Sequence, residues 1–354
     1  MTINLKFQLL FVAILSCFLL GFSCDKSVEP VEPTDYPFYI SATNPNQIFT
    51  FHPQTKKLDS TAVPWNAAIT ASADGKLLYV ALGSSVLVVD AKTFTEIAEI
   101  PYPHQAIAVS PDNKYLALTG DDLFILRTSD YSLIFSDSAG ILYGSVSFSV
   151  DSRTLYCAVR IDVGSSHVVL KVELNDSTFQ KSWYSFTGGS VVQVLPSIDE
   201  TKLFLYSAVG LWTYAFEVYD VLQDSIIFRD ILVPGGGEMA LTPNGKFVFY
   251  TSPGRSGTDP PPDYSFKIFD VAANQIDTVV ADSTFFYFGV IPGAPKRLAV
   301  TPDSRWLGII GGQLSLLTFY LYDIRNKELI YRKEIDSSLN NFNTFLNITV
   351  KEMK

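Results

Sequence analysis

Short apolar strands alternate with polar turns along most of the chain. The stretch VSPDNKYLALTG shows the unit: an apolar strand that ends at Ser110, a turn that Lys114 closes, and a second apolar strand. The same phrase returns as ASADGKLLYVAL, FSVDSRTLYCAV, LPSIDETKLFLYS, LTPNGKFVFYTS and VTPDSRWLGIIG. Pro presets one turn dihedral, Asp and Asn bond to their own backbone, and Gly or Asn tolerates positive φ. Each copy therefore predicts a β-hairpin.

A second phrase follows each hairpin. A strand such as SVLVVD, TYAFEVYD, SFKIFD or FYLYDI leads into a short polar turn and a fourth strand such as TEIAEI or KELIYRKEI. A carboxylate at the start of such a turn can cap free backbone N–H groups, and this interpretation is favoured over metal ligation because short turns commonly have this composition. The aspartates at that position are Asp90, Asp220, Asp270 and Asp323. The basic residues that close the first turns are Lys76, Lys114, Arg153, Lys202, Lys246 and Arg305.

Four strands per repeat, with a repeat every 40 residues or more, are the pattern of a β-propeller. Six complete repeats run from about Ala68 to Asp336. Before them, YPFYISAT, QIFTFHP and KLDSTAV resemble the last three strands of a repeat, and FNTFLNITVK near the C-terminus resembles a first strand. We therefore predict an all-β, seven-bladed β-propeller with four-stranded antiparallel blades over residues 38–354. The ring is expected to be closed by a blade split between the N- and C-termini, since an open last blade would expose a strand edge.

Two longer phrases carry a family resemblance. LLYVALGSSVLVVDAKTFTEIAEI and FVFYTS followed by SFKIFDVAANQIDTVV resemble the YVTN family of seven-bladed propellers, which is akin to the lactonase-like group. The resemblance extends over about residues 38–350 and implies the propeller fold. It also implies an alternative function, a lactonase-like metal-dependent hydrolase whose site at the axial mouth would include His104 and Glu238.

The first 23 residues differ from the rest. Lys6 precedes the apolar run LLFVAILSCFLLGF, after which the chain turns polar and proline-rich. This pattern predicts an export signal peptide, with a single membrane-spanning anchor as the alternative. The segment LLGFSC resembles the lipobox of bacterial lipoproteins, with Gly21 where Leu is usual, which implies that Cys24 becomes the lipidated first residue. Residues 24–37 would then be a Pro/Glu-rich tether, and the resemblance implies an outer-membrane lipoprotein that is exposed on the cell surface.

Net charge and cysteine content limit the classes of partner that the chain can bind. The chain has 36 Asp and Glu against 26 Lys and Arg, a formal net charge of −10. Such a surface repels nucleic acid and anionic lipid, so we expect no nucleic-acid partner and a membrane link through the N-terminal lipid alone. With Cys17 in the signal peptide and Cys24 lipidated, only Cys157 remains, and it is expected to be a small buried residue.

Catalytic motifs are weak. The three histidines have no paired spacing, GRSGT lacks the last glycine of a nucleophile elbow, and PGGGE has neither the helix nor the lysine of a phosphate loop. Asp259 and Asp263 flank three prolines, without the regular spacing of oxygen ligands that would support calcium. We expect no catalytic residue, no metal site and no cofactor.

One face of the propeller holds nearly all the extra chain length. Connections between strands two and three, and from one blade to the next, emerge on what we call the loop face; the remaining turns form the turn face. Binding usually occurs on loops of a rigid scaffold, although tolerated insertions or a scaffold whose partner covers a flank are alternatives. Aromatic, amide and charged groups suit a glycan or a protein partner. The expected ligand-binding residues, for which packing between blades is the alternative, are Trp65, Tyr102, His104, Tyr143, Trp212, Glu238, Tyr264, Tyr287 and Arg297.

Overall fold

The structure is a computed structural model, and its propeller unit spans Tyr36–Lys354. It describes residues 36–43, 46–65, 68–138, 142–160, 166–175, 178–187, 189–210, 213–232, 238–252, 265–281, 298–313, 316–336 and 347–350. Regular secondary structure within these ranges consists of β-strands alone.

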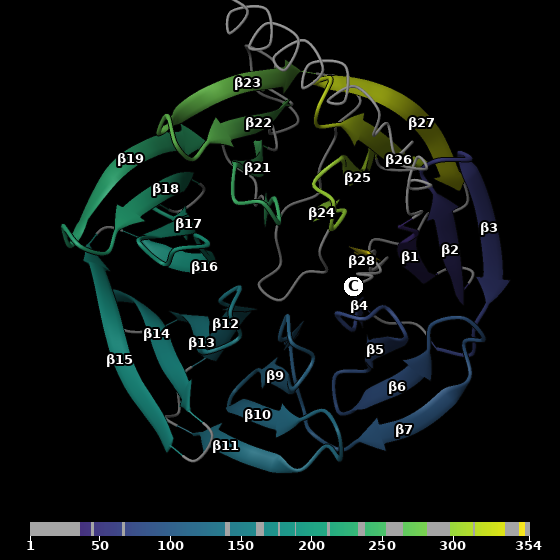
Figure 1. The fold of residues 1–354 in the computed structure, drawn as a ribbon, viewed down its shortest axis with the longest axis horizontal. Helices are drawn as coiled ribbons and strands as arrows, with labels where there is room; N and C mark the ends of the chain where they lie inside the picture. The colour runs from purple at the N-terminus through teal and green to yellow at the C-terminus, as the bar shows by residue number, and fades with distance from the viewer. Residues whose placement is uncertain are drawn as a thin grey trace, which may run out of the picture. The chain divides into compact units, whose positions relative to one another are not determined.

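The strands form seven four-stranded antiparallel sheets, the blades of a β-propeller (Figure 1). Blade 1 contains β4 (Ala68–Ala71), β5 (Leu77–Ala81), β6 (Val86–Asp90) and β7 (Glu96–Ile100). Blade 2 contains β8 (Ala106–Val109), β9 (Tyr115–Thr119), β10 (Leu123–Arg127) and β11 (Leu133–Asp137). Blade 3 contains β12 (Leu142–Phe148), β13 (Thr154–Arg160), β14 (Ser166–Asn175) and β15 (Thr178–Thr187).

The other blades follow the same order from the axis to the rim. Blade 4 contains β16 (Ser190–Pro196), β17 (Lys202–Ala208), β18 (Tyr214–Asp220) and β19 (Ser225–Leu232). Blade 5 contains β20 (Met239–Leu241), β21 (Phe247–Ser252), β22 (Ser265–Asp270) and β23 (Gln275–Ala281). Blade 6 contains β24 (Leu298–Val300), β25 (Trp306–Gln313), β26 (Leu316–Asp323) and β27 (Glu328–Asp336).

Blade 7 closes the ring. It joins β28 (Asn347–Val350) to β1 (Phe38–Thr43), β2 (Asn46–His52) and β3 (Lys57–Ala62). Strand β28 is antiparallel to β1, with Phe38 opposite Val350 and Ile40 opposite Ile348. The prediction of a blade split between the two ends of the chain is confirmed.

The repeated phrase forms one type of turn. In blade 2, the Ser110 hydroxyl donates to Asp112 at 2.7 Å and accepts from the N–H of Tyr115 at 2.9 Å. The residue after the Asp or Asn adopts positive φ in all six copies, which are Gly75, Asn113, Ser152, Glu200, Gly245 and Ser304. One part of the prediction is wrong: in blade 4 the residue equivalent to Lys114 is Thr201, whose N–H and hydroxyl donate to Asp199. Lys202 lies one position later, where it begins β17.

The second set of turns is also confirmed. Asp90 Oδ1 accepts from the N–H groups of Lys92 and Thr93 at 2.9 and 2.7 Å. Equivalent backbone caps occur at Asp220, Asp270 and Asp323. These carboxylates are occupied by their own turns, as capping requires.

The core lies between neighbouring blades. Each apolar cluster joins side chains of adjacent sheets, as where Phe216 of blade 4 stacks on Tyr250 of blade 5 with ring centroids 4.1 Å apart. Cys157 is fully buried in the cluster between blades 2 and 3, and burial raises the pKa of its thiol. This burial confirms the prediction that Cys157 is a small buried residue. A thiol with a raised pKa is also a poor nucleophile.

Two inner strands depart from the others in length. Strands β12 and β16 have seven residues each, whereas the inner strands of the other blades have three or four. Each contains a register shift, between Tyr143 and Val146 in β12 and between Val191 and Gln193 in β16. The side-chain amide of Gln193 in β16 bonds to the next blade: its Nε2 donates to Met239 O at 3.0 Å, and its Oε1 accepts from Met239 N–H at 2.8 Å. Blades 3 and 4 therefore extend further toward the loop face.

Candidate binding face

Hydrogen bonds assign the turns to their faces. The turn between strands one and two contacts the turn between three and four of the same blade, as where Ala91 N–H donates to Lys76 O at 2.8 Å. Blades 2 to 6 repeat this contact, for example from Val271 N–H to Lys246 O at 3.0 Å. Both sets therefore lie on one side, the turn face, and the connections after strands two and four lie on the loop face.

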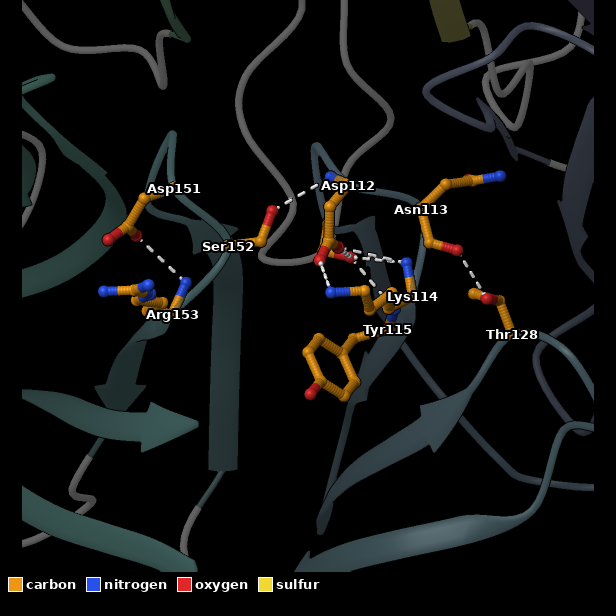
Figure 2. Close-up of polar contacts among 9 residues, drawn as sticks. Asp112, Asn113, Lys114, Tyr115, Thr128, Asp151, Ser152 and Arg153 are labelled. Atoms are coloured by element: carbon orange, nitrogen blue, oxygen red, sulfur yellow. Dashed lines mark hydrogen bonds and ion pairs between the residues drawn. The ribbon is translucent and has the colours of Figure 1, made fainter. Parts of the chain in front are cut away.

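The turn face is a belt of turns that bond to one another. Figure 2 shows Asp112 of blade 2 donating its N–H to the hydroxyl of Ser152 in blade 3 at 2.9 Å. The side-chain oxygen of Asn113 accepts from Ala73 N–H of blade 1 at 3.3 Å, and the backbone carbonyl of Asn113 accepts from the hydroxyl of Thr128 at 2.5 Å. Lys114 closes the turn with an ion pair to Asp112 at 3.0 Å. These bonds hold the turns in place and stabilise the scaffold.

On the loop face, backbone hydrogen bonds join the first three blades around His104. His104 N–H donates to Gly83 O of blade 1 at 2.9 Å, and Tyr143 N–H of blade 3 donates to Gly120 O of blade 2, also at 2.9 Å. A Cβ added to Gly120 would lie 3.5 Å from the Cα of His104, so the turn at Gly120 packs directly on the histidine. The backbone on either side of the ring is therefore fixed.

His104 has an unusual ring environment. Its Nδ1 lies 3.1 Å from the carbonyl oxygen of Tyr102, which can only accept, so Nδ1 carries the proton. Nε2 is then an acceptor, and it is buried with no hydrogen-bond partner among the described residues. Burial lowers the pKa of His104, which keeps the ring neutral. An unpartnered buried acceptor costs free energy, but a ligand donor could reach Nε2 only after the residues that cover it had moved.

Three of the aromatic residues expected to bind a ligand are at least partly packed into the scaffold. Trp65 is 8% exposed in the cluster between blades 7 and 1, and the ring of Tyr102 lies 4.8 Å from that of Phe124. Tyr143 does not precede its inner strand: the bulge extends β12 back to Leu142, so Tyr143 pairs with Val159 and is 1% exposed. Burial and the nearby Asp137 raise the pKa of its hydroxyl. Tyr143 therefore packs between blades and presents no surface to a ligand, which corrects its expected role.

Glu238 lies before the inner strand of blade 5. Its backbone pairs with Thr251, donating to the hydroxyl at 3.0 Å and accepting from the N–H at 3.1 Å. Blades 3 and 4 separate it from His104 of blade 2 along the shorter way around the ring. The other expected positions lie outside the described residues, namely Cys24, Trp212, Tyr264, Tyr287, Arg297, Asp259 and Asp263.

Within the ranges that the structure describes, no three His, Cys, Asp or Glu side chains come together in a group that could hold a metal ion. No helix long and apolar enough to cross a membrane occurs there either.

Known proteins share the fold at low sequence identity. No protein-family model matches the sequence, and no curated protein is similar to it by sequence. A functionally unknown protein from Desulfotomaculum acetoxidans has a TM-score of 0.64 and 10% identity over 89% of this chain and 99% of its own. A putative 6-phosphogluconolactonase from Bacteroides fragilis has a TM-score of 0.61 and 13% identity over 90% and 99%. A putative 6-phosphogluconolactonase from Bacteroides uniformis has a TM-score of 0.60 and 13% identity over 89% of this chain and 100% of its own. The chain is thus a seven-bladed β-propeller with lactonase-like structural neighbours, and the likeness extends to the fold alone.

Proposed function

We propose that the chain is a lipid-anchored, noncatalytic binding protein of the outer membrane that recognises a glycan or an envelope protein through its loop face. The difference between the two faces carries the proposal. Side chains on the turn face are engaged in their own turns and in bonds to the next blade. The connections on the loop face are unequal in length, from residues 44–45 after β1 to residues 282–297 after β23. Variable connections on a uniform scaffold are typical of binding surfaces.

His104 supports this choice of ligand. Its neutral ring is held in place by the carbonyl of Tyr102, and Nε2 would accept a hydrogen bond from a ligand that displaced the residues covering it. Sugars and peptides present hydroxyl and amide donors, and they commonly bind between such acceptors and aromatic rings. Tyr102, two residues before His104 and packed on Phe124, would supply a rigid ring beside it.

Paired alanine sets test the choice of face. One set replaces Trp212, Tyr264, Tyr287 and Tyr102, and the other replaces Lys76, Lys114 and Lys246 on the turn face. Each variant is first checked for an unchanged Tm, and binding is then measured against a panel of polysaccharides and envelope proteins. Loss of an aromatic anchor should cost about 1 to 4 kcal/mol of binding free energy. If the turn set abolishes binding and the aromatic set does not, the proposed face is wrong.

The rival function is a lactonase-like hydrolase, which the description of both Bacteroides neighbours as putative 6-phosphogluconolactonases suggests. His104 and Glu238 would be its metal ligands at the axial mouth. Lactone hydrolysis by the purified chain, measured with and without added divalent cations, discriminates the two functions. Activity that depends on the cation and is lost in both His104→Ala and Glu238→Ala would replace the binding proposal.

A further inference from the structure

Strand β15 differs from the other outer strands of the propeller. All ten of its residues pair with β14 without interruption, from Thr178 opposite Asn175 to Thr187 opposite Ser166. In blades 1, 2, 4, 5 and 6, a register shift interrupts the pairing of the outer strand with its neighbour. The outer strand of blade 7, β3, is uninterrupted but has only six residues, among them the ion pair of Lys57 with Asp59. Bulges, short length and charges are the usual protection of strand edges, and β15 has little of any of them.

The outer edge of β15 is not paired with another strand in the part of the chain that the structure describes. In the described residues, β15 pairs only with β14, and it lies on the rim of the ring in Figure 1. Its one charged residue is Lys181. Trp183, two positions along on the same face of the strand, is 42% exposed. An open ladder beside an exposed aromatic side chain is a surface suited to a further strand.

Packing on both faces holds β15 in place. Toward blade 2, Phe179 contacts Phe135 with ring centroids 5.1 Å apart, and Lys181 pairs with Asp137 at 3.1 Å. Toward blade 4, Phe186 meets Tyr219 with ring centroids 4.8 Å apart. A strand fixed in this way loses little conformational freedom when a partner binds.

We propose that two copies of this chain associate through β15, as antiparallel strands related by a two-fold axis at Ser182. The sequence TFQKSWYSFT is complementary to itself in this register. Lys181, whose ammonium group pairs with Asp137 of its own chain, then lies opposite the partner's Trp183, so that its aliphatic stem can pack on the indole ring. The small Ser182 faces its own copy at the axis. A two-fold axis at Lys181 would set like charges opposite each other, which is unfavourable. The inference is independent of the proposed function, since it requires only the fold.

Cysteine cross-linking of the full chain in a non-ionic detergent tests the register. Ser182→Cys should form an intermolecular disulfide on mild oxidation, because directly opposed Cβ atoms lie about 5 Å apart. Ser185→Cys is the matched control on the same exposed edge: its two copies would be about 20 Å apart and should not react. The parent chain, with its own Cys17, Cys24 and Cys157, gives the background. The proposed register is wrong if both variants form the disulfide equally, or if Ser182→Cys forms no more disulfide than the parent chain.

Sedimentation equilibrium of the same preparations tests the association itself. Trp183→Lys should weaken dimerisation at least tenfold by placing lysines opposite each other, whereas Trp183→Phe should retain it. Leu133→Lys, a similarly exposed change on the outer strand β11, is the control and should have no effect. Unchanged Tm values show that each variant is folded. A monomeric parent chain would overturn the proposal, as would dimers that Leu133→Lys disrupts as much as Trp183→Lys does. A monomer that binds a strand of a different protein on β15 would show that the partner is not a second copy.

Discussion

Removing the closing strand should destabilise the entire ring. Deletion of residues 342–354 takes away β28, which forms four register pairs with β1. At a net value of about 1 kcal/mol for each of roughly four backbone hydrogen bonds, the loss is about 4 kcal/mol. It also opens the edge beside Phe38 and Ile40, both 0% exposed. Because blades stabilise one another through shared interfaces, the loss should appear in the single unfolding transition.

Thermal melting followed by circular dichroism measures this effect. At roughly 2 °C per kcal/mol in a chain of this size, the Tm should fall by about 8 °C. Deletion of Asp25–Thr34 in the predicted tether is the control and should leave the Tm nearly unchanged. Equal Tm values for the two truncations would refute the inference that the split blade closes and stabilises the ring.

Three further predictions follow from single side chains. Cys24→Ala should leave the protein unlipidated and move it to the aqueous phase of a detergent partition, while a mature protein that begins at another residue and has no lipid would contradict the anchor. Tyr156→Phe should cost about 1 to 2 kcal/mol in urea unfolding by removing the hydrogen bond to Glu200, whereas Tyr322→Phe, at a buried hydroxyl without a partner, should be neutral or stabilising; equal effects would contradict this. Since burial holds the pKa of His104 below its usual 6.5, the unfolded chain binds the proton more readily, and stability should fall as the pH drops below about 6.5. Melting from pH 7.5 to 5 should show a smaller decrease in His104→Gln, and an identical decrease would contradict the assignment.

The fold could be predicted because its determinants are local. The turn at Ser110 needs only the Asp and the residue of positive φ that follow within three positions, so the same few letters mark each copy. The error at Lys202 has a local cause as well. A basic residue was expected to close every turn, but the bond to Asp199 requires only an N–H, which Thr201 supplies.

The site was less predictable because its determinants are distant in sequence. The bulge that places Tyr143 inside β12 lies where Gly144 approaches the next blade. A Cβ added at Gly144 would lie 3.6 Å from the carbonyl oxygen of Val192. The sequence indicated that His104 precedes an inner strand, but its lone acceptor results from burial beside Gly83 and Gly120 of different turns. Contacts between residues many positions apart leave no local signature.

The uninterrupted edge of β15 accompanies a departure from the repeated phrase. In blades 1, 4, 5 and 6 an Asp ends the third strand, its carboxylate caps the following N–H groups, and the register shifts just before it. In blade 3 the same ladder position, opposite Thr154, is Glu173, which pairs with Lys171 at 2.8 Å instead. The cap that would end the strand is missing from this position, and β14 continues through Leu174 to Asn175. Its partner β15 extends over ten residues without a bulge. The missing Asp does not produce this edge alone, because blade 2 has Arg127 at the same position and its outer pairing still shifts register.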